Sequence, residues 1–299
     1  MYLVSAAGLT RGGGGMTGSR LKVYRVGGDV CQLCGATPLE EFVVPGAATL
    51  WHCAQCGLYQ NGRVADTSAY EAEYHDGYER HRNKKRRTAM VRLNRIAPLV
   101  KAERPRLLDV GSSVGCVVEA ALERGWEAVG TDVSASAVEF CRKRKLPCQL
   151  YDGDTLPFAD SSFDVLTSWH VIEHVAGVKT TLAEWFRVLR PGGVLALETP
   201  DASSPLVRRR GSNYRKFWAP EHTYTFTPAT LATFVERAGF RLLAPPMFGR
   251  LADLSPLMAA YTLAYQAYHG FRKVAGIQKA FQIFAQRPAE EAQRMRAAA

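Results

Sequence analysis

Apolar runs alternate with amphipathic segments through the centre of the chain. In the stretch RLLDVGSSVG, Leu107, Leu108 and Val110 form a nearly unbroken apolar run, which is typical of a buried parallel strand. Similar runs predict strands at 127–132, 148–151, 163–169, 194–199, 240–245 and 279–286. Amphipathic spacing predicts helices at 135–145, 178–189 and 229–238, the last with Thr227 as N-cap. Strands alternating with helices predict an α/β fold with a Rossmann-like, doubly wound, mostly parallel sheet.

The turn after the first predicted strand has the residue types of a nucleotide site. Asp109 lies near the end of this strand, and Gly111 and Gly115 bracket a short turn before a predicted helix. Backbone N–H groups converge on a polar ligand at such a turn. Asp132 ends the next predicted strand, 23 positions after Asp109, where its carboxylate is placed to accept both hydroxyls of a ribose.

The motifs of this region resemble those of class I S-adenosylmethionine-dependent methyltransferases. Their first motif reads acid-x-G-x-G-x-G, and Ser113 stands here at the middle glycine position. The resemblance continues through YDGDTLPF, FDVLTSWHVIEHV and RVLRPGGVLALETP. It implies S-adenosyl-L-methionine as cofactor. The residues implied are Asp109, Gly111, Ser113 and Gly115 for the amino-acid end, Asp132 and Val133 for the ribose, and Asp152 and Gly153 for the adenine edge, with His170 as a further cofactor candidate.

The segment after the fourth predicted strand carries the candidate catalytic residues His170, Glu173 and His174. In many relatives an E-H pair stands here beside the transferable methyl group. His174 could act as general base on an acceptor hydroxyl, because its unperturbed pKa lies near neutrality. The three residues also resemble the E-x-x-E-H metal triad of some O-methyltransferases, in which a divalent ion would lower the pKa of an acceptor hydroxyl. A structural hydrogen-bonding role is the third interpretation.

Candidate acceptor residues come from two other segments. Relatives carry a W…E-H…F-T block that forms one wall of the acceptor pocket, and the corresponding segment here makes Trp218, His222 and Tyr224 acceptor candidates. His222 is also a catalytic candidate, although it could merely tie the loop to the core. Tyr78 belongs to a predicted helical stretch whose tyrosines recur every fourth residue. It either closes over the acceptor or packs against the larger domain.

Two C-x-x-C pairs near the amino terminus predict a structural zinc site. Cys31 and Cys34 are separated from Cys53 and Cys56 by 18 residues, and four thiolates complete a tetrahedral zinc shell. Such a shell leaves no open position for catalysis. Short apolar segments between the pairs resemble the strands of a zinc ribbon. The remaining cysteines are isolated in the sequence and are expected to be inert packing residues.

Composition and charge narrow the classes of protein. The chain of 299 residues is 47% hydrophobic and 22% charged, as in soluble globular proteins, and no apolar run reaches the roughly 18 residues needed to cross a bilayer. The first residues lack a signal-peptide pattern, so we expect a cytoplasmic protein. The net charge is +10, and 80–106 alone holds 11 Lys or Arg against one Glu. This segment is either a solvated face or a phosphate-binding surface.

The expected organisation has five parts. They are a disordered leader (1–28), a zinc ribbon (29–62), a helical linker (63–104), a methyltransferase domain (105–288) and a tail (289–299). The domain contains an unusual insertion, 251–276, whose apolar residues at 254, 258, 261, 265 and 268 have helical spacing. This helix is interpreted as a lid or homodimer helix, or as a peripheral membrane helix ended by Arg272 and Lys273.

Three functions remain open. The first is methylation of a small-molecule acceptor, such as a sugar, a glycolipid or a natural product, at oxygen or carbon. The second is methylation of ribosomal or transfer RNA through the basic segment 80–106. Against it, no N-P-P-Y or D-P-P-Y motif follows the fourth predicted strand. The third is a non-catalytic binding protein with a vestigial cofactor pocket.

Overall fold

The computed structural model describes residues 30–45, 48–61, 81–214, 217–219, 221–244 and 249–289. The expected leader (1–28), Tyr78 with the first part of the linker, and the tail beyond residue 289 lie outside the described residues. Among the described helices, none is long and apolar enough to cross a membrane.

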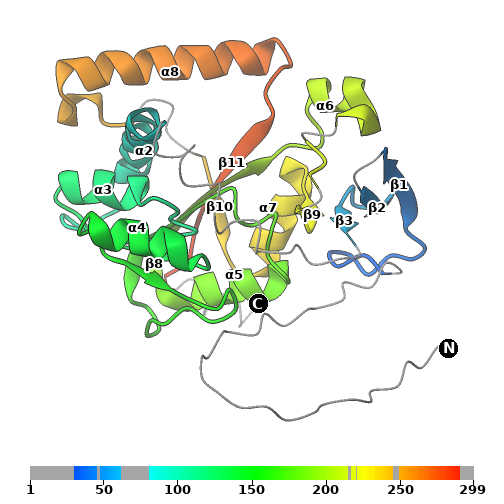
Figure 1. Ribbon diagram of the computed structural model, residues 1–299, viewed down its shortest axis with the longest axis horizontal. Helices are drawn as coiled ribbons and strands as arrows, with labels where there is room; N and C mark the ends of the chain where they lie inside the picture. The colour runs from blue at the N-terminus through cyan, green and yellow to red at the C-terminus, as the bar shows by residue number, and fades with distance from the viewer. Residues whose placement is uncertain are drawn as a thin grey trace.

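A seven-stranded sheet forms the centre of the larger domain (Figure 1). Its strands are β4 (Arg106–Val110), β5 (Glu127–Asp132), β6 (Cys148–Leu150), β7 (Phe163–Trp169), β8 (Leu189–Pro200), β10 (Arg241–Leu243) and β11 (Ala280–Gln286). Their order is β10-β11-β8-β7-β4-β5-β6. The five strands from β8 to β6 are parallel to one another, whereas β11 pairs antiparallel with both β8 and β10. The predicted mostly parallel α/β sheet is confirmed.

Helices cover both faces of this sheet. They are α2 (Arg82–Ile96), α3 (Cys116–Glu123), α4 (Ala135–Lys143), α5 (Val178–Val188), α6 (Pro205–Arg210), α7 (Pro228–Arg237) and α8 (Pro256–Val274), with short 3-10 turns η2 (Ala97–Leu99), η3 (Gly211–Asn213) and η4 (Leu251–Asp253). Apolar residues of α2 and α3 form one core layer, which includes Leu93 and Val117. Residues of α5 and α7, among them Trp185 and Phe234, form the other layer. Two buried layers around one sheet make the fold doubly wound.

The helix ends follow from local side chains, with one correction to the predicted boundaries. Thr227 caps α7 through a reciprocal capping box with Thr230, as its position before Pro228 predicts. The fifth strand was predicted to begin at residue 194, but Pro191–Gly193 also lies inside β8. There the N–H of Gly192 donates to the carbonyl of Arg287 at 2.8 Å. The glycine with φ of 83° lets the strand bulge and continue, so α5 runs directly into β8.

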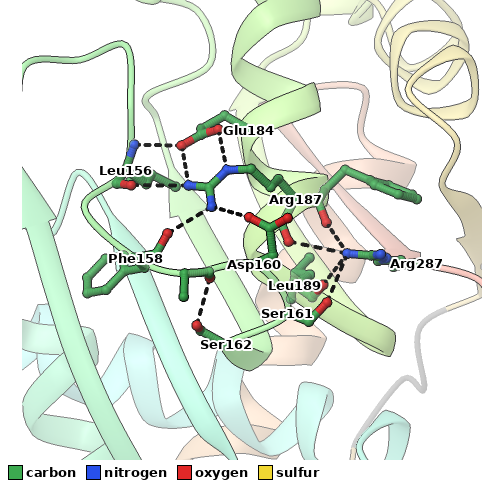
Figure 2. Close-up of polar contacts among 11 residues, drawn as sticks. Leu156, Phe158, Asp160, Ser161, Ser162, Glu184, Arg187, Leu189 and Arg287 are labelled. Carbon is green, nitrogen blue, oxygen red and sulfur yellow. Dashed lines mark hydrogen bonds and ion pairs between the residues drawn. The ribbon is translucent and has the colours of Figure 1, made fainter.

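The loop before β7 is held by one arginine of α5. Figure 2 shows the Arg187 guanidinium binding the carboxylates of Glu184 and Asp160 and the carbonyl oxygens of Leu156 and Phe158, at distances of 2.6–3.2 Å. Glu184 also accepts the N–H of Leu156 at 2.8 Å. This network fixes the chain that leads from the predicted adenine edge at 152–153 back into the sheet.

The cysteine-bearing module shares its sheet with the larger domain. Strands β1 (Glu40–Val44), β2 (Ala48–His52) and β3 (Tyr59–Asn61) pair antiparallel, and β9 (Tyr224–Thr225) adds a fourth strand to the edge of β3. The short apolar segments between the cysteine pairs, expected to be strands, form β1 and β2. Its pairing with a segment more than 160 positions later is not visible in the local pattern. The module is therefore continuous with the W…E-H…F-T block.

Candidate active site

Three residues with left-handed backbone build the turn between β4 and α3. The φ angles of Gly111, Ser113 and Gly115 are 74°, 48° and 72°. A Cβ atom on Gly111 would lie 2.2 Å from Cγ2 of Val171, so only glycine fits there. Ser113 keeps the left-handed conformation despite its side chain, and its Oγ is buried without a partner among the described residues.

Asp132 fastens this turn to the end of β5. One carboxylate oxygen accepts the N–H of Ser113 at 2.8 Å, and the other accepts the N–H of Ser134 at 2.9 Å. The carboxylate is half-buried at the carboxyl end of the sheet. A carboxylate offers about four acceptor sites, so a group of this kind at a strand end is suited to bind the hydroxyls of a ribose. The predicted cofactor residues Gly111, Ser113, Gly115 and Asp132 are thus brought to one place.

Asp109 and Asp152 have different surroundings from Asp132. Asp109 is buried and accepts the hydroxyl of Thr167 at 2.6 Å. Burial raises the pKa of Asp109 to about 7. Asp152 is exposed and accepts the N–H groups of Asp154 and Thr155, which shapes the turn around Gly153. A Cβ atom on Gly153 would lie 3.5 Å from Val133, so these two cofactor candidates are neighbours.

A network of charged side chains lies where β7 and β8 end. His170 lies 3.2 Å from a carboxylate oxygen of Glu173 through Nδ1 and 3.1 Å from Glu198 through Nε2. The Arg92 guanidinium of α2 binds the same Glu198 oxygen. Burial would lower the pKa of His170, but the two carboxylates raise it to about 10. Burial opposes ionisation of both acids, yet their cationic partners hold the pKa values of Glu173 and Glu198 below the usual range.

Sequence reasoning missed two members of this network. Glu198 belongs to the motif of the fifth predicted strand. Its position near the end of that strand was the only sequence feature that could have marked it as a site residue. Arg92 is one cation in a basic run and has no distinguishing neighbour in the sequence. In the structure its guanidinium stacks 4.1 Å from the centre of the Trp169 ring. Two cations and two carboxylates therefore balance one another beneath α2.

Glu173, His174 and His222 form a second cluster beside the network. Each offers one metal-ligand atom, and these atoms lie within 4.8 Å of one another. Nδ1 of His174 lies 2.9 Å from the carbonyl oxygen of Glu221, so it donates its proton there and leaves Nε2 as an acceptor. The ring of His222 lies edge-on to His174, with 4.9 Å between centroids. Burial lowers the pKa of His222 to about 4, so it is neutral near pH 7.

This cluster changes the metal triad expected from the sequence. The expectation grouped His170 with Glu173 and His174, but the structure turns both ring nitrogens of His170 toward carboxylates. His222 takes its place near Glu173 and His174. His222 joins the cluster only in the folded protein, because the loop that carries Glu221 and His222 folds back over the end of β7.

Trp218 and Tyr224, which the sequence assigned to the acceptor wall, are both buried against other segments of the protein. Trp218 is buried against Phe42 and Tyr59, with ring centroids 4.7 and 4.9 Å away. Its Nε1–H donates to the carbonyl of Gly211. Tyr224 is also buried, and its hydroxyl lies 3.2 Å from the carbonyl oxygen of Ala176. Both side chains hold the loop and the cysteine module together.

The four cysteines of the module converge as a zinc shell requires. Sγ of Cys31 lies 3.4 Å from Sγ of Cys56, and Sγ of Cys34 lies 3.6 Å from Sγ of Cys53. Zinc–sulfur bonds of about 2.3 Å in a tetrahedron separate sulfurs by roughly 3.8 Å, so the four residues fit the ion. The other cysteines are not all isolated in space. Beside the Ser113 turn, the Cys141 thiol donates to the carbonyl of Ser113 at 3.3 Å, and Sγ of Cys148 accepts the hydroxyl of Ser112 at 3.7 Å.

Comparisons with known proteins agree with this geometry. The family described as "Methyltransferase domain" matches residues 78–244. The biotin biosynthesis bifunctional protein BioHC of Cellvibrio japonicus is 31% identical over 167 residues, which is 51% of this chain and 32% of that protein. A demethylmenaquinone methyltransferase of Corynebacterium urealyticum is 30% identical over 38% of this chain and 48% of its own length. A ubiquinone biosynthesis O-methyltransferase of Mesorhizobium japonicum is 27% identical over 46% and 60%.

The chain covers less than two thirds of the length of each of these relatives. A chain in the complex of the Haloferax volcanii Trm112 methyltransferase activator with its methyltransferase partner superposes with a TM-score of 0.50 and 19% identity. It covers 73% of this chain and 95% of its own length, and this likeness concerns the fold alone. The glycine turn, the carboxylate that ends β5 and the family match lead to one conclusion: the chain belongs to the class I S-adenosylmethionine-dependent methyltransferases.

Proposed function

We propose that the protein transfers a methyl group from S-adenosylmethionine to a hydroxyl or carbon of a small-molecule acceptor, with His174 as the base. One observation carries the base assignment. Nδ1 of His174 lies 2.9 Å from the carbonyl oxygen of Glu221, so the neutral ring carries its proton on Nδ1 and its basic lone pair on Nε2. A neutral imidazole held in one tautomer is what a general base needs.

The residues around the turn fit the cofactor. When bound, S-adenosylmethionine supplies an electrophilic methyl group on its sulfonium. Asp132 would hold the ribose, the Gly111–Gly115 turn with Asp109 the amino-acid end, and Asp152 with Gly153 the adenine edge. The unpartnered Oγ of Ser113 is a polar atom that a ligand at this turn would satisfy. Transfer then depends mainly on aligning the acceptor and excluding water.

The balance of buried charges supports a role for His174 that does not involve a bound metal ion. Glu173 would be the anionic ligand of a divalent ion, but it is already paired with His170, and Glu198 is paired with Arg92. A divalent ion would add two positive charges to a network that is balanced without it, and burying unbalanced charge is costly. We therefore assign Glu173 to holding His170, and His174 and His222 to the acceptor.

Two observations support a small molecule over RNA. Arg82 and Arg86 pair with Glu119 and Glu123 of α3, and Arg92 pairs with Glu198, so much of the basic segment is engaged inside the molecule. Paired arginines contribute little to phosphate binding. In addition, the names of several relatives indicate methylation in menaquinone and ubiquinone biosynthesis.

The proposal is tested by measuring which class of acceptor receives a labelled methyl group. The purified protein is incubated with methyl-labelled S-adenosylmethionine and either the small-molecule extract or the total RNA of its source cells. We expect label in the small-molecule fraction. Label in RNA alone, with binding that weakens steeply as salt rises, would establish the RNA alternative. If calorimetric titration detects no binding of S-adenosylhomocysteine, the alternative of a non-catalytic binding protein would stand instead.

The cysteine module has a structural part in this proposal. Cys31, Cys34, Cys53 and Cys56 would hold one zinc ion in a closed shell. Because β9 belongs to the same sheet, the ion stabilises the segment that leads from His222 into α7. The zinc therefore supports the acceptor side of the site without touching the acceptor.

A further inference from the structure

Helix α8 lies beside the candidate site. Figure 1 shows it as a long helix across one side of the molecule, next to α2. The guanidinium carbon of Arg87 in α2 lies 5.9 Å from the centre of the Tyr261 ring in α8. Burial raises the pKa of Tyr265, and the charges of Arg92 and Glu198 also act on this residue. One face of α8 is therefore directed at the network beneath α2.

The opposite face of α8 is apolar and exposed. Leu257, Leu263, Tyr268, Phe271 and Val274 are between 45% and 91% exposed. Between them stand alanines and a glycine, and only Thr262 of the whole helix is fully buried. Tyr268, which the spacing in the sequence grouped on one face with Tyr261 and Tyr265, belongs to this exposed face. A 19-residue helix in a globular protein usually buries its apolar stripe.

Positive charge lies at the carboxyl end of this face. Helix α8 contains no Asp or Glu, and its last turn carries Arg272 and Lys273. The N–H of Leu206 in α6 donates to the carbonyl of Gly276, just after α8, at 3.0 Å. This bond places α6 beside the end of α8, as Figure 1 also shows. The last three residues of α6 are the exposed arginines Arg208, Arg209 and Arg210.

We propose that the outer face of α8, together with the α6 arginines, binds the surface of a membrane that contains anionic lipid. An apolar helix face flanked by Lys and Arg lies in the interface between headgroups and acyl chains. Anionic headgroups attract the adjacent cations, and each Lys or Arg near such a surface strengthens binding by about fivefold. A second copy of the chain fits less well, because two surfaces that both lack acids and carry clustered arginines repel each other.

Docking in this orientation has a consequence for the acceptor. Tyr265 on the inner face of α8 is near enough to Arg92 and Glu198 for their charges to act on it, so membrane binding would bring the candidate site close to the lipid surface. If the proposed methyl transfer is correct, the acceptor is an amphiphile presented by the membrane. This consequence rests on the proposed function, whereas the docking does not.

Vesicle flotation of the full chain tests the docking. The protein is mixed at about 0.1 M salt with vesicles of phosphatidylcholine alone, or with phosphatidylcholine containing roughly 30% phosphatidylglycerol. We expect flotation only with the anionic vesicles. Phe271→Glu should reduce the bound fraction at least tenfold, whereas Val43→Glu, an equal charge change at an exposed apolar residue of β1, should leave it unchanged. Arg209→Glu should reduce vesicle affinity more than Lys143→Glu, which changes an exposed lysine of α4.

Three outcomes would overturn the docking. Equal flotation of the wild type and Phe271→Glu, or no flotation of the wild type, would exclude α8 as a lipid-binding face. A dimer that dissociates on Phe271→Glu, detected by sedimentation without vesicles, would make the face a contact between two copies. Calorimetric binding of S-adenosylhomocysteine is measured on the same samples. Intact binding with failed flotation refutes the docking alone, and lost cofactor binding with normal flotation refutes the proposed function alone.

Discussion

His170 Nδ1 lies 3.2 Å from Glu173 Oε1, so a half-exposed imidazole is paired with a fully buried carboxylate in the loop after β7. The pair is held in place by Thr199, whose hydroxyl donates to the second oxygen of Glu173 at 2.9 Å. His170 itself has a left-handed backbone with φ of 60°. This conformation directs its ring between Glu173 and Glu198.

The pairing of His170 predicts that stability falls as the pH rises. The folded state keeps the His170 proton up to a pKa of about 10, whereas the unfolded state releases it near 6.5. The folded state therefore binds more protons between these values, and the free energy of unfolding declines with pH across this window. Because the ring is half-exposed, solvent screening limits the effect to about 1 kcal/mol.

Urea unfolding at pH 6.5, 8 and 9.5 measures this decline. Wild type should lose more stability over the series than His170→Gln, and the difference between the two removes the contribution of other titrating groups. Parallel pH dependences of the two proteins would show that His170 is not held in its charged form.

Removing the base should affect turnover and leave cofactor binding intact. His174→Gln cannot accept a proton from the acceptor, so kcat should fall by about 10²–10⁴ for an oxygen acceptor. The affinity for S-adenosylhomocysteine, measured by calorimetry, should stay within about twofold, since His174 lies beyond the turn that holds the cofactor. His52→Gln, a change in β2, is the matched control. Near-normal kcat in His174→Gln would rule out the base assignment.

Asp132 should be needed for cofactor binding. Asp132→Ala removes a carboxylate that organises Ser113 and Ser134 and would accept the ribose hydroxyls. Hydrogen bonds to a charged group contribute about 1.5–3 kcal/mol each, so affinity for S-adenosylhomocysteine should fall about a hundredfold or more. Calorimetry measures the change, with Glu139→Ala on the surface of α4 as control. An affinity within threefold of wild type would place the ribose elsewhere.

The cysteine module should contain one zinc ion per chain. Elemental analysis of the purified protein should show this stoichiometry, and Cys31→Ser should lose the metal and unfold at a lower temperature, because metal binding contributes to folding. Cys116→Ser, which changes a buried cysteine outside the module, should retain zinc. Retention of the full zinc content in Cys31→Ser would contradict a four-thiolate site.

Trp218 should matter for stability and not for acceptor binding. Trp218→Ala removes a buried ring that packs on Phe42 and Tyr59, and we expect a loss of about 3–5 kcal/mol in the free energy of unfolding. In the less disruptive variant Trp218→Phe, KM for the acceptor should stay within twofold. His222→Asn should change KM or kcat instead. A large KM effect confined to Trp218→Phe would return this residue to the acceptor wall.

Much of the fold could be predicted because its patterns are local. The bounds of β5 and β7 agree with those predicted from apolar runs, and the N-cap at Thr227 follows from the residue types on either side of it. The glycine turn and the two C-x-x-C pairs were also recognisable, because short spacing constrains backbone geometry strongly. These features require only a few consecutive residues to specify them.

The long-range arrangements could not be predicted in this way. Arg92 meets Glu198 across 106 positions, and Glu221 reaches His174 across 47. No repeating pattern in the sequence reveals either pair, because the partner of a charged side chain depends on which strands and loops pack beside it. Trp218 illustrates the same limit, because its motif pointed to the acceptor whereas its ring fills the space against the cysteine module.

By itself, the sequence determined the order of strands and helices, the cofactor turn and the four-cysteine module, because backbone preference and apolar periodicity act over neighbouring residues. Only the tertiary structure decided which charges neutralise each other, which histidine joins His174 and which face of α8 stays exposed. These depend on burial, and a side chain becomes buried only when distant segments pack against it.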